Sequence, residues 1–200
     1  MYSSYKFFYG LMKKILFSTL VVLSLSSCAL YKEEVVNLRI ESSNQIYNPG
    51  NSNRVEVLVF DDRINKEIIG NKRIGEDLVA IKTTQNLADL IKSKMIQGLE
   101  HKGFVIGEGK IFELHIVSLD YNANRDFFTG HSKANILFKV VIKDRIDMNR
   151  KYQRNYGLTI DKDHFIMPLL TTDELNINYV LQETFDDVFK DVDLLENLRN

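Results

Sequence analysis

The stretch that decides the fold class is residues 111–119, which read Ile-Phe-Glu-Leu-His-Ile-Val-Ser-Leu. Successive side chains of a β-strand point to opposite faces, so these residues fall into two alternating sets. One set contains Ile111, Val117 and Leu119, and the other contains Phe112, Leu114 and Ile116. Because both sets are largely apolar, this stretch predicts a strand near the centre of a sheet.

Shorter runs on both sides of this strand are also rich in β-branched and apolar residues. They predict further strands at residues 54–60, 67–69, 77–81, 134–143 and 152–160. The second and third of these runs are short strands or a hairpin, with turn signals between them at Gly70-Asn71 and Gly75.

Two other stretches have the three- and four-residue apolar spacing of amphipathic helices. The first covers residues 87–99, follows candidate N-caps at Thr83 and Thr84, and is followed by Gly103, a suitable residue just past a helix end. The second covers residues 171–195 and opens on Thr-x-x-Glu, which matches a capping box. We therefore expect an α+β fold: a two-layer sandwich in which a mainly antiparallel sheet carries two amphipathic helices on one face.

The overall composition excludes several classes of protein. The 200 residues carry 26 Lys and Arg against 27 Asp and Glu, a formal net charge of −1. Binding to the nucleic-acid backbone rests on an excess of basic residues, so we expect no nucleic-acid partner. The single cysteine rules out an intrachain disulfide and a zinc site made of several cysteines.

The N-terminus has the three regions of a secretory signal peptide. Lys13 and Lys14 precede a mostly apolar run at residues 15–25, and two serines follow. Eleven residues are too few for a membrane-spanning helix, which needs about 20. Met12 is an alternative start of translation, because residues 1–11 lack the compact shape of a signal peptide.

The cysteine follows this segment directly. Leu25, Ser26, Ser27 and Cys28 resemble the bacterial lipobox, in which the cysteine is lipidated and becomes the first residue of the mature chain. The resemblance implies a lipid anchor at Cys28 and no thiol left for chemistry. The residue after it is Ala29 rather than Asp, which resembles a signal for sorting to the outer membrane. The alternative is a buried core cysteine, the usual fate of a lone thiol.

These features divide the chain into three parts. Residues 1–27 are expected to be the signal peptide, and residues 28–53 a lipidated cysteine and flexible tether that includes a short strand at Val35–Ile40. Residues 54–200 form a single periplasmic α+β domain. Removal of the signal peptide takes away three lysines and no acidic residue, which leaves 23 basic against 27 acidic side chains.

Motifs for catalysis or cofactor binding are few. His101, His115, His131 and His164 have no spacing typical of metal ligands, and we expect no metal and no cofactor. Paired acids such as Asp61-Asp62 can serve hydrolysis, but adjacent acids are more often solvated or used as caps. Seven basic residues between Lys133 and Arg154 are either a solvated face or a contact for anionic envelope material.

One loop is a candidate contact surface. The connection at residues 120–133 contains Tyr121, Arg125, Phe127 and Phe128, and aromatic residues exposed between polar ones suit a partner-binding tip. In the alternative interpretation the two phenylalanines fold back as a lid on the core.

In the order and spacing of these elements, the chain resembles the YajG family of bacterial lipoproteins. The likeness runs from the Met12-Lys-Lys signal and lipobox to the C-terminus. It includes Val55-Glu-Val-Leu-Val-Phe-Asp-Asp-Arg63, Lys102-Gly-Phe104, Leu119-Asp-Tyr121, Lys133-Ala-Asn135, Tyr152 and Tyr156. The family implies an outer-membrane lipoprotein but supplies no catalytic residues. The chain also resembles the LptE-type assembly lipoproteins, which are small lipidated α+β domains.

The expected function is therefore that of a non-enzymatic envelope lipoprotein. It would be anchored by lipid on the periplasmic side of the outer membrane and would bind an unknown protein partner or an envelope polymer. The alternatives are an LptE-like assembly factor, or a lipid-anchored cell-wall hydrolase that uses Asp61 or Asp62 as its acid.

Overall fold

The computed structural model describes residues 33–41, 49–126, 129–146, 148–164 and 170–200. The strands are β1 (Glu33–Val35), β2 (Arg54–Asp61), β3 (Ile68–Ile74), β4 (Asp77–Lys82), β5 (Val105–Ile106), β6 (Lys110–Arg125), β7 (Gly130–Lys143) and β8 (Arg150–His164). The helices are α2 (Leu87–His101), α3 (Leu170–Lys190) and α4 (Val192–Arg199). The α+β class expected from the sequence is confirmed.

Strand β6 lies at the centre of the sheet, as residues 111–119 predict. It pairs with antiparallel β7 on one side, and on the other side first with β2 and then with β3. A bulge between Ile116 and Ser118 leaves Val117 exposed and brings Leu119 onto the buried face. An inserted residue shifts the alternation by one, which explains why apolar residues occur on both faces in the sequence.

The sheet is mainly antiparallel, as the sequence predicted, but it also contains parallel pairs that the sequence did not predict. The antiparallel pairs are β3–β4, β6–β7 and β7–β8, and the parallel pairs are β1–β4, β2–β5, β2–β6 and β3–β6. Strands β2 and β3 follow one another along the same side of β6, because residues 62–67 carry the chain forward instead of turning it back. The result is a break along one side of the sheet between Asp61 and Ile68.

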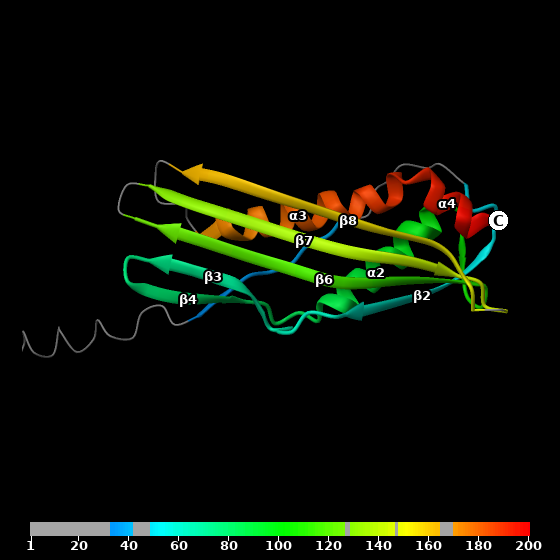
Figure 1. Cartoon of the computed structure of the whole chain (residues 1–200), viewed down its shortest axis with the longest axis horizontal. Helices are drawn as coiled ribbons and strands as arrows, with labels where there is room; N and C mark the ends of the chain where they lie inside the picture. The colour runs from blue at the N-terminus through cyan, green and yellow to red at the C-terminus, as the bar shows by residue number, and fades with distance from the viewer. Residues whose placement is uncertain (1–32, 42–48, 127–128, 147, 165–169) are drawn as a thin grey trace, which may run out of the picture. The chain divides into compact units, whose positions relative to one another are not determined.

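The three helices contribute to one core with the sheet, and Figure 1 shows them behind the strands, on a single face. The expected helix at 171–195 is two helices, because Asp191 interrupts it and caps α4 by accepting from the Leu194 N–H at 3.1 Å. Helix α2 is capped by Asn86 instead of Thr83 or Thr84. As expected, Gly103 has a positive φ, +80°, and lies just past the end of this helix.

The folded domain begins at Glu33, earlier than the boundary at Arg54 expected from the sequence. Residues 33–41, which we call the strap, pair with β4 through β1 and continue across the helical side. Val36, Leu38 and Ile40 are buried in the core. Their alternation with polar residues gives the strap one apolar edge that the core covers, so this part of the expected tether is folded.

Side chains of α3 accept hydrogen bonds from the backbone N–H groups along the outer edge of the strap. Glu174 accepts from the Asn37 N–H, Asn178 from the Arg39 N–H and Gln182 from the Glu41 N–H, at 3.2, 2.8 and 2.7 Å. These helix residues recur every four positions, about 6.0 Å along the axis, and alternate strand residues recur about every 6.6 Å. The near match lets one helix face take the place of a neighbouring strand.

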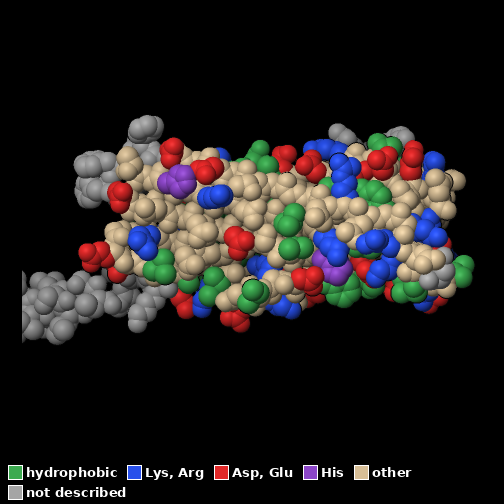
Figure 2. Space-filling view, in the orientation of Figure 1, with side chains coloured by type: hydrophobic (Ala, Val, Ile, Leu, Met, Phe, Trp, Pro, Cys, Tyr) green, Lys and Arg blue, Asp and Glu red, His purple; other side chains and the backbone are tan. Residues whose placement is uncertain are grey.

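The opposite face of the sheet has no helix packed on it within the described ranges. Figure 2 shows this face, on which hydrophobic side chains are scattered among polar and charged ones. Hydrogen bonds cross it from Thr159 to Asn135 at 2.9 Å and from Asn135 to Ser118 at 3.2 Å. Among the helices of the described part, none is long and apolar enough to span a membrane.

Candidate functional site

A groove lies at the break between β2 and β3. It has a volume of about 980 Å³, within the range of small-molecule sites. The ends of β1, β2 and β4, the loop at 62–67 and the start of α2 form its walls. Its lining residues are Glu33, Val35, Val59, Phe60, Asp61, Asp62, Lys66, Glu67, Lys82, Thr83, Thr84, Gln85, Asn86, Leu87 and Ala88.

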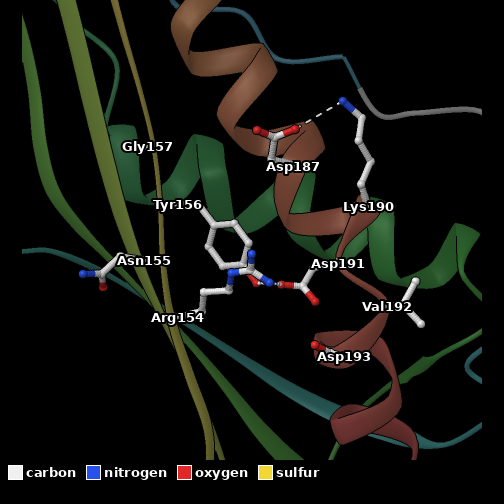
Figure 3. Close-up of a pocket in the computed structure, with 9 residues that line it drawn as sticks. All are labelled: Arg154, Asn155, Tyr156, Gly157, Asp187, Lys190, Asp191, Val192 and Asp193. Atoms are coloured by element: carbon white, nitrogen blue, oxygen red, sulfur yellow. Dashed lines mark hydrogen bonds and ion pairs between the residues drawn. The ribbon is translucent and has the colours of Figure 1, made fainter.

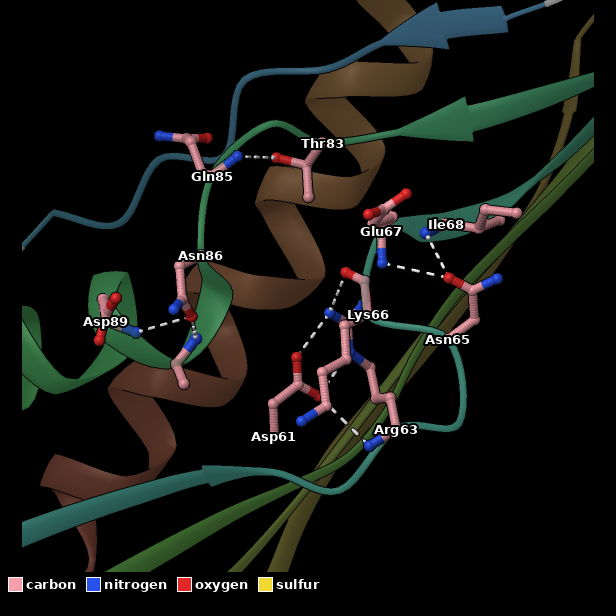
Figure 4. A network of polar contacts seen from close by, with 11 residues as sticks. Asp61, Arg63, Asn65, Lys66, Glu67, Ile68, Thr83, Gln85, Asn86 and Asp89 are labelled. Atoms are coloured by element: carbon pink, nitrogen blue, oxygen red, sulfur yellow. Dashed lines mark hydrogen bonds and ion pairs between the residues drawn. The ribbon is translucent and has the colours of Figure 1, made fainter.

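An ion pair holds the loop that forms one wall of the groove (Figure 4). Arg63 donates from Nε and Nη2 to the two carboxylate oxygens of Asp61 at 2.9 and 2.8 Å, and from Nη2 to the Lys66 carbonyl at 2.8 Å. Both side chains are buried, and Arg63 Nη1 has no partner within the described ranges. A bidentate pair of this kind fixes the loop where the chain passes from β2 to β3.

Short-range hydrogen bonds hold the rest of the rim. Asn65 Oδ1 accepts from the backbone N–H groups of Glu67 and Ile68 at 3.1 and 3.0 Å. Asn86 Oδ1 accepts from Ala88 and Asp89 at the start of α2, at 3.1 and 3.3 Å. Side chains that hydrogen-bond their own backbone in this way stabilise turns and helix starts. The rim is therefore preformed.

One residue that lines the groove, Phe60, belongs to an aromatic pair. Phe60 is stacked on His115 with ring centroids 5.0 Å apart, and it remains substantially exposed. His115 Nδ1 lies 2.8 Å from Asp62 Oδ2. The groove thus combines an exposed aromatic ring with charged groups, a combination suited to binding.

The two adjacent acids of the sequence have different surroundings. Asp61 is buried and held by Arg63, whereas Asp62 is half-exposed and contacts His115. Neighbouring positions of a strand point to opposite faces, and the two carboxylates accordingly have different partners. Among the described residues, no three His, Cys, Asp or Glu side chains come together as a metal site.

A second pocket, of about 500 Å³, lies between β8 and the α3–α4 junction (Figure 3). Asp191 Oδ2 accepts from Tyr152, Tyr156 and Arg154, each at 2.7 Å. Burial by itself would raise the pKa of Asp191, but hydrogen bonds from Tyr156, Tyr152 and the Leu194 N–H, with the Arg154 charge, lower it below its usual range. This arrangement holds the helix junction to the sheet.

The predicted partner-binding loop is mostly strand. Residues 110–125 belong to β6 and residues 130–143 to β7, so only residues 126–129 of the expected connection at 120–133 lie outside these two strands. Tyr121 and Arg125 are buried, and both donate to Asp173, Tyr121 at 2.6 Å. They face the core because the bulge in β6 sets the alternation, and they are unavailable to a partner.

The other predicted site residues lie outside the described residues. They are Leu25, Ser26, Ser27, Cys28, Ala29, Phe127 and Phe128.

Sequence reasoning missed a cluster of buried charges. Lys72 contacts Glu34 and also Asp173, the latter at 3.0 Å, and Arg125 contacts Asp173. We call Glu34, Lys72, Arg125 and Asp173 the charge cluster. Its members come from β1, β3, β6 and α3, and each occupies a position on its element where an apolar side chain is the usual occupant. The sequence contains one indication of this cluster: charged residues stand at positions where the strand alternation or the helical spacing predicts core residues.

Comparisons with known proteins give one clear match in sequence. The family model Lipoprotein_16, described as an uncharacterized lipoprotein, matches residues 40–199. This agrees with the resemblance to the YajG family. A comparison with curated proteins gives no significant match.

Solved structures resemble this chain to different degrees. A Xanthomonas campestris protein of the DUF330 family superposes with a TM-score of 0.55 at 9% identity, over 78% of this chain and 91% of that one. A homologue of the neuraminyllactose-binding hemagglutinin from Helicobacter pylori gives 0.47 at 8% identity, over 82% and 97%. A minor lipoprotein from Acinetobacter baumannii gives 0.32 at 8% identity, over 74% and 91%. Only the first is similar enough to support a common fold. With the family model covering most of the folded domain, the chain belongs to the YajG-type family of bacterial envelope lipoproteins.

Proposed function

We propose that this protein is a non-enzymatic lipoprotein of the outer membrane, held on the periplasmic side by lipid at Cys28, and that its groove binds a protein partner or an envelope polymer. The observation that carries the binding role is the groove at the β2–β3 break. It combines a preformed rim with exposed apolar side chains, while its buried acid, Asp61, is already neutralised by Arg63. Such a site offers surface for contact with a partner and few free groups that could take part in catalysis.

The anchor is supported by the sequence around the cysteine and by the family. Leu25-Ser-Ser-Cys28 follows a basic and apolar leader, and Ala29 is the residue expected for outer-membrane sorting. Two or more acyl chains hold a protein at a bilayer stably, whereas one holds it only marginally. Metabolic labelling with palmitate tests the anchor: Cys28→Ser is expected to abolish labelling, and unchanged labelling would refute it.

In-cell photocrosslinking tests the groove. A photoreactive residue placed at Phe60 or Lys66 is expected to give a discrete adduct, and the same residue at Asn122, on the uncovered face, is the matched control. Protease treatment of the adduct identifies a protein partner, and muramidase treatment identifies peptidoglycan. Adducts of equal yield at all three positions would refute a groove-specific partner.

A second experiment keeps the photoreactive residue at Phe60 or Lys66 and substitutes a different residue of the groove. Val35→Arg places a cation among the apolar contacts at the groove, and Leu78→Arg is its control, because Leu78 is also an exposed apolar residue but does not line the groove. Loss of the adduct in the first variant alone is expected. Equal loss in both would indicate a general effect on folding or export.

One observation favours the hydrolase alternative: Asp62, which lines the groove, contacts His115. Its test is the single variant Asp62→Asn with muropeptide release as the readout. Asp61 is unsuitable for this test, because its loss would leave Arg63 buried and unpaired. Loss of release in a folded Asp62→Asn protein would establish the hydrolase and overturn the binding-only proposal.

A further inference from the structure

The exposed stripe of α3 changes character along the helix. Near its start the stripe consists of Leu175 and Tyr179, which are 66% and 48% exposed. Farther along, the exposed residues of the helix are the charged Asp187 and Lys190. A surface helix of a globular protein normally carries polar residues along this whole stripe. The apolar start therefore points to a surface that something covers.

A lysine lies over the aromatic ring. Lys162 of β8 places Nζ 5.6 Å from the centre of the Tyr179 ring, and it donates to Asn176 Oδ1 at 3.0 Å. Tyrosine is enriched at membrane–water interfaces, where its ring sits at the level of the lipid headgroups. Lysine extends its ammonium group from an apolar stem toward the same level. Leu175, Tyr179 and Lys162, which we call the α3 patch, match this chemistry.

The strap enters the domain beside this patch. The Asn37 N–H donates to Glu174, the neighbour of Leu175. Glu34 contacts Lys72, which contacts Asp173 in the first turn of α3. The first residues that the structure describes, the strap, are therefore attached where the α3 patch begins.

The chain between lipid and domain is short. Four residues, 29–32, separate Cys28 from Glu33, so the two Cα atoms are at most about 18 Å apart. The strap cannot lengthen this connection at low cost, because Val36, Leu38 and Ile40 are buried and Glu34 is held in the charge cluster. The bilayer that holds the anchor is consequently within reach of the α3 patch.

We infer that the α3 patch rests on the lipid headgroups of the membrane in which the protein is anchored. The inference deepens the proposed function and rests on the lipidation of Cys28. It assigns α3 a membrane-facing side at its start and leaves α4, at the other end of that helix, farther from the bilayer. The contact is mainly apolar, so it is expected to persist at high salt.

Tryptophan fluorescence provides the test, since the chain contains no tryptophan. Full-length lipidated protein with Tyr179→Trp is reconstituted in vesicles of phosphatidylethanolamine and brominated phosphatidylcholine. Strong quenching and a blue-shifted emission are expected. The control variants are Val192→Trp and Ile146→Trp, at positions that are 61% and 95% exposed, and both are expected to stay unquenched. Leu175→Trp replaces Tyr179→Trp if the latter fails to fold.

Two further measurements make the outcome decisive. Leu78→Trp lies on the uncovered face of the sheet, and quenching there that equals or exceeds quenching at position 179 would overturn the proposal. A Gly/Ser insertion of about 20 residues after Lys32, spanning on the order of 25 Å as a coil, is expected to weaken the quenching at position 179.

Flotation of the vesicles separates the two proposals. Protein that floats with the vesicles but shows no quenching at position 179 overturns the membrane contact and leaves the anchor intact. Protein that does not float overturns lipidation and, with it, the contact.

Discussion

Asp173 and Asp191 each accept several hydrogen bonds where a C-terminal helix begins, yet their surroundings differ. Asp173 is fully buried and receives Lys72, Arg125 and Tyr121. Asp191 lines an open pocket and receives two tyrosine hydroxyls and the exposed Arg154. The buried site contains two cations and two anions, because Glu34 completes the charge cluster.

The difference shows how depth determines the composition of a polar network. Away from water, a net charge is costly, and the charge cluster balances its charges within the protein. Near the surface, Asp191 pairs with a single cation, the exposed Arg154, whose charge water also screens, and neutral hydroxyls donate its other hydrogen bonds. An aspartate therefore helps to hold four segments together at the first site, as Asp173, and caps a helix at the second, as Asp191.

Loss of the buried carboxylate is expected to have the largest effect. Asp173→Asn leaves Lys72 and Arg125 with one anion between them, and it should lower the free energy of unfolding by about 3–5 kcal/mol. Urea denaturation followed by circular dichroism measures the change. Asp187→Asn, on the exposed side of the same helix, is the control and is expected to change stability by less than about 0.5 kcal/mol. Equal effects would contradict the role of the charge cluster.

Removal of the second aspartate should cost less. Asp191→Ala deletes the α4 cap and the shared acceptor, for which we expect a loss of about 1–2 kcal/mol. The adjoining pocket and the exposed side chain of Arg154 let water reach the site once the carboxylate is removed, which limits the loss. Asp193→Ala, in the first turn of α4, is the matched control in the same denaturation experiment. A loss as large as that of Asp173→Asn would show that exposure does not separate the two sites.

The link between the strap and α3 is expected to be weaker still. Asn178→Ala removes one acceptor and one donor from the strap edge and should lower stability by about 0.5–1.5 kcal/mol. Hydrogen exchange at the Arg39 amide is the direct measurement, and it should become faster. Glu183→Ala, which lies on α3 away from the residues that bind the strap, serves as the control. Unchanged exchange at Arg39 would mean that the strap is held by its buried apolar side chains alone.

The smallest effect concerns pH. Hydrogen bonds and the Arg154 charge outweigh burial and lower the pKa of Asp191, so its contribution to stability is fully present above the pKa of an unfolded aspartate, about 3.9. It is lost as the pH falls through the lower pKa of the folded state. The stability difference between the wild-type protein and Asp191→Asn should therefore shrink as the pH falls below about 4. A difference that grows on acidification would reverse the sign of the argument.

The elements of the fold could be predicted where one local pattern decides them. Residues 111–119 predicted the central strand, and the apolar spacing of residues 87–99 predicted α2. The break at Asp191 escaped prediction, because the apolar stripe continues through it in phase. Gly70, read as a turn, lies inside β3, where a Cβ atom would collide with the backbone of Tyr121. That requirement arises from the neighbouring strand.

The candidate site was less accessible to prediction. The Asp61-Asp62 pair was noticed, but its division between Arg63 and His115 depends on the face to which each side chain points. The groove exists because β2 and β3 share one side of β6, and no local pattern encodes that pairing. Tyr121 and Arg125 were placed on a loop, because the polar alternation after Leu119 conceals a strand with a buried charged end.

By itself, the sequence determined the α+β fold class, the family resemblance and the expected lipidation site at Cys28, because these depend on composition, on the order of the elements and on contiguous motifs. Only the tertiary structure decided that residues 33–41 belong to the domain, that the charges of Glu34, Lys72, Arg125 and Asp173 balance in its interior, and that an apolar stretch of α3 begins beside the strap. The physical reason is that burial and charge pairing join residues far apart in the chain, and such pairings exist only once the sheet and helices have packed.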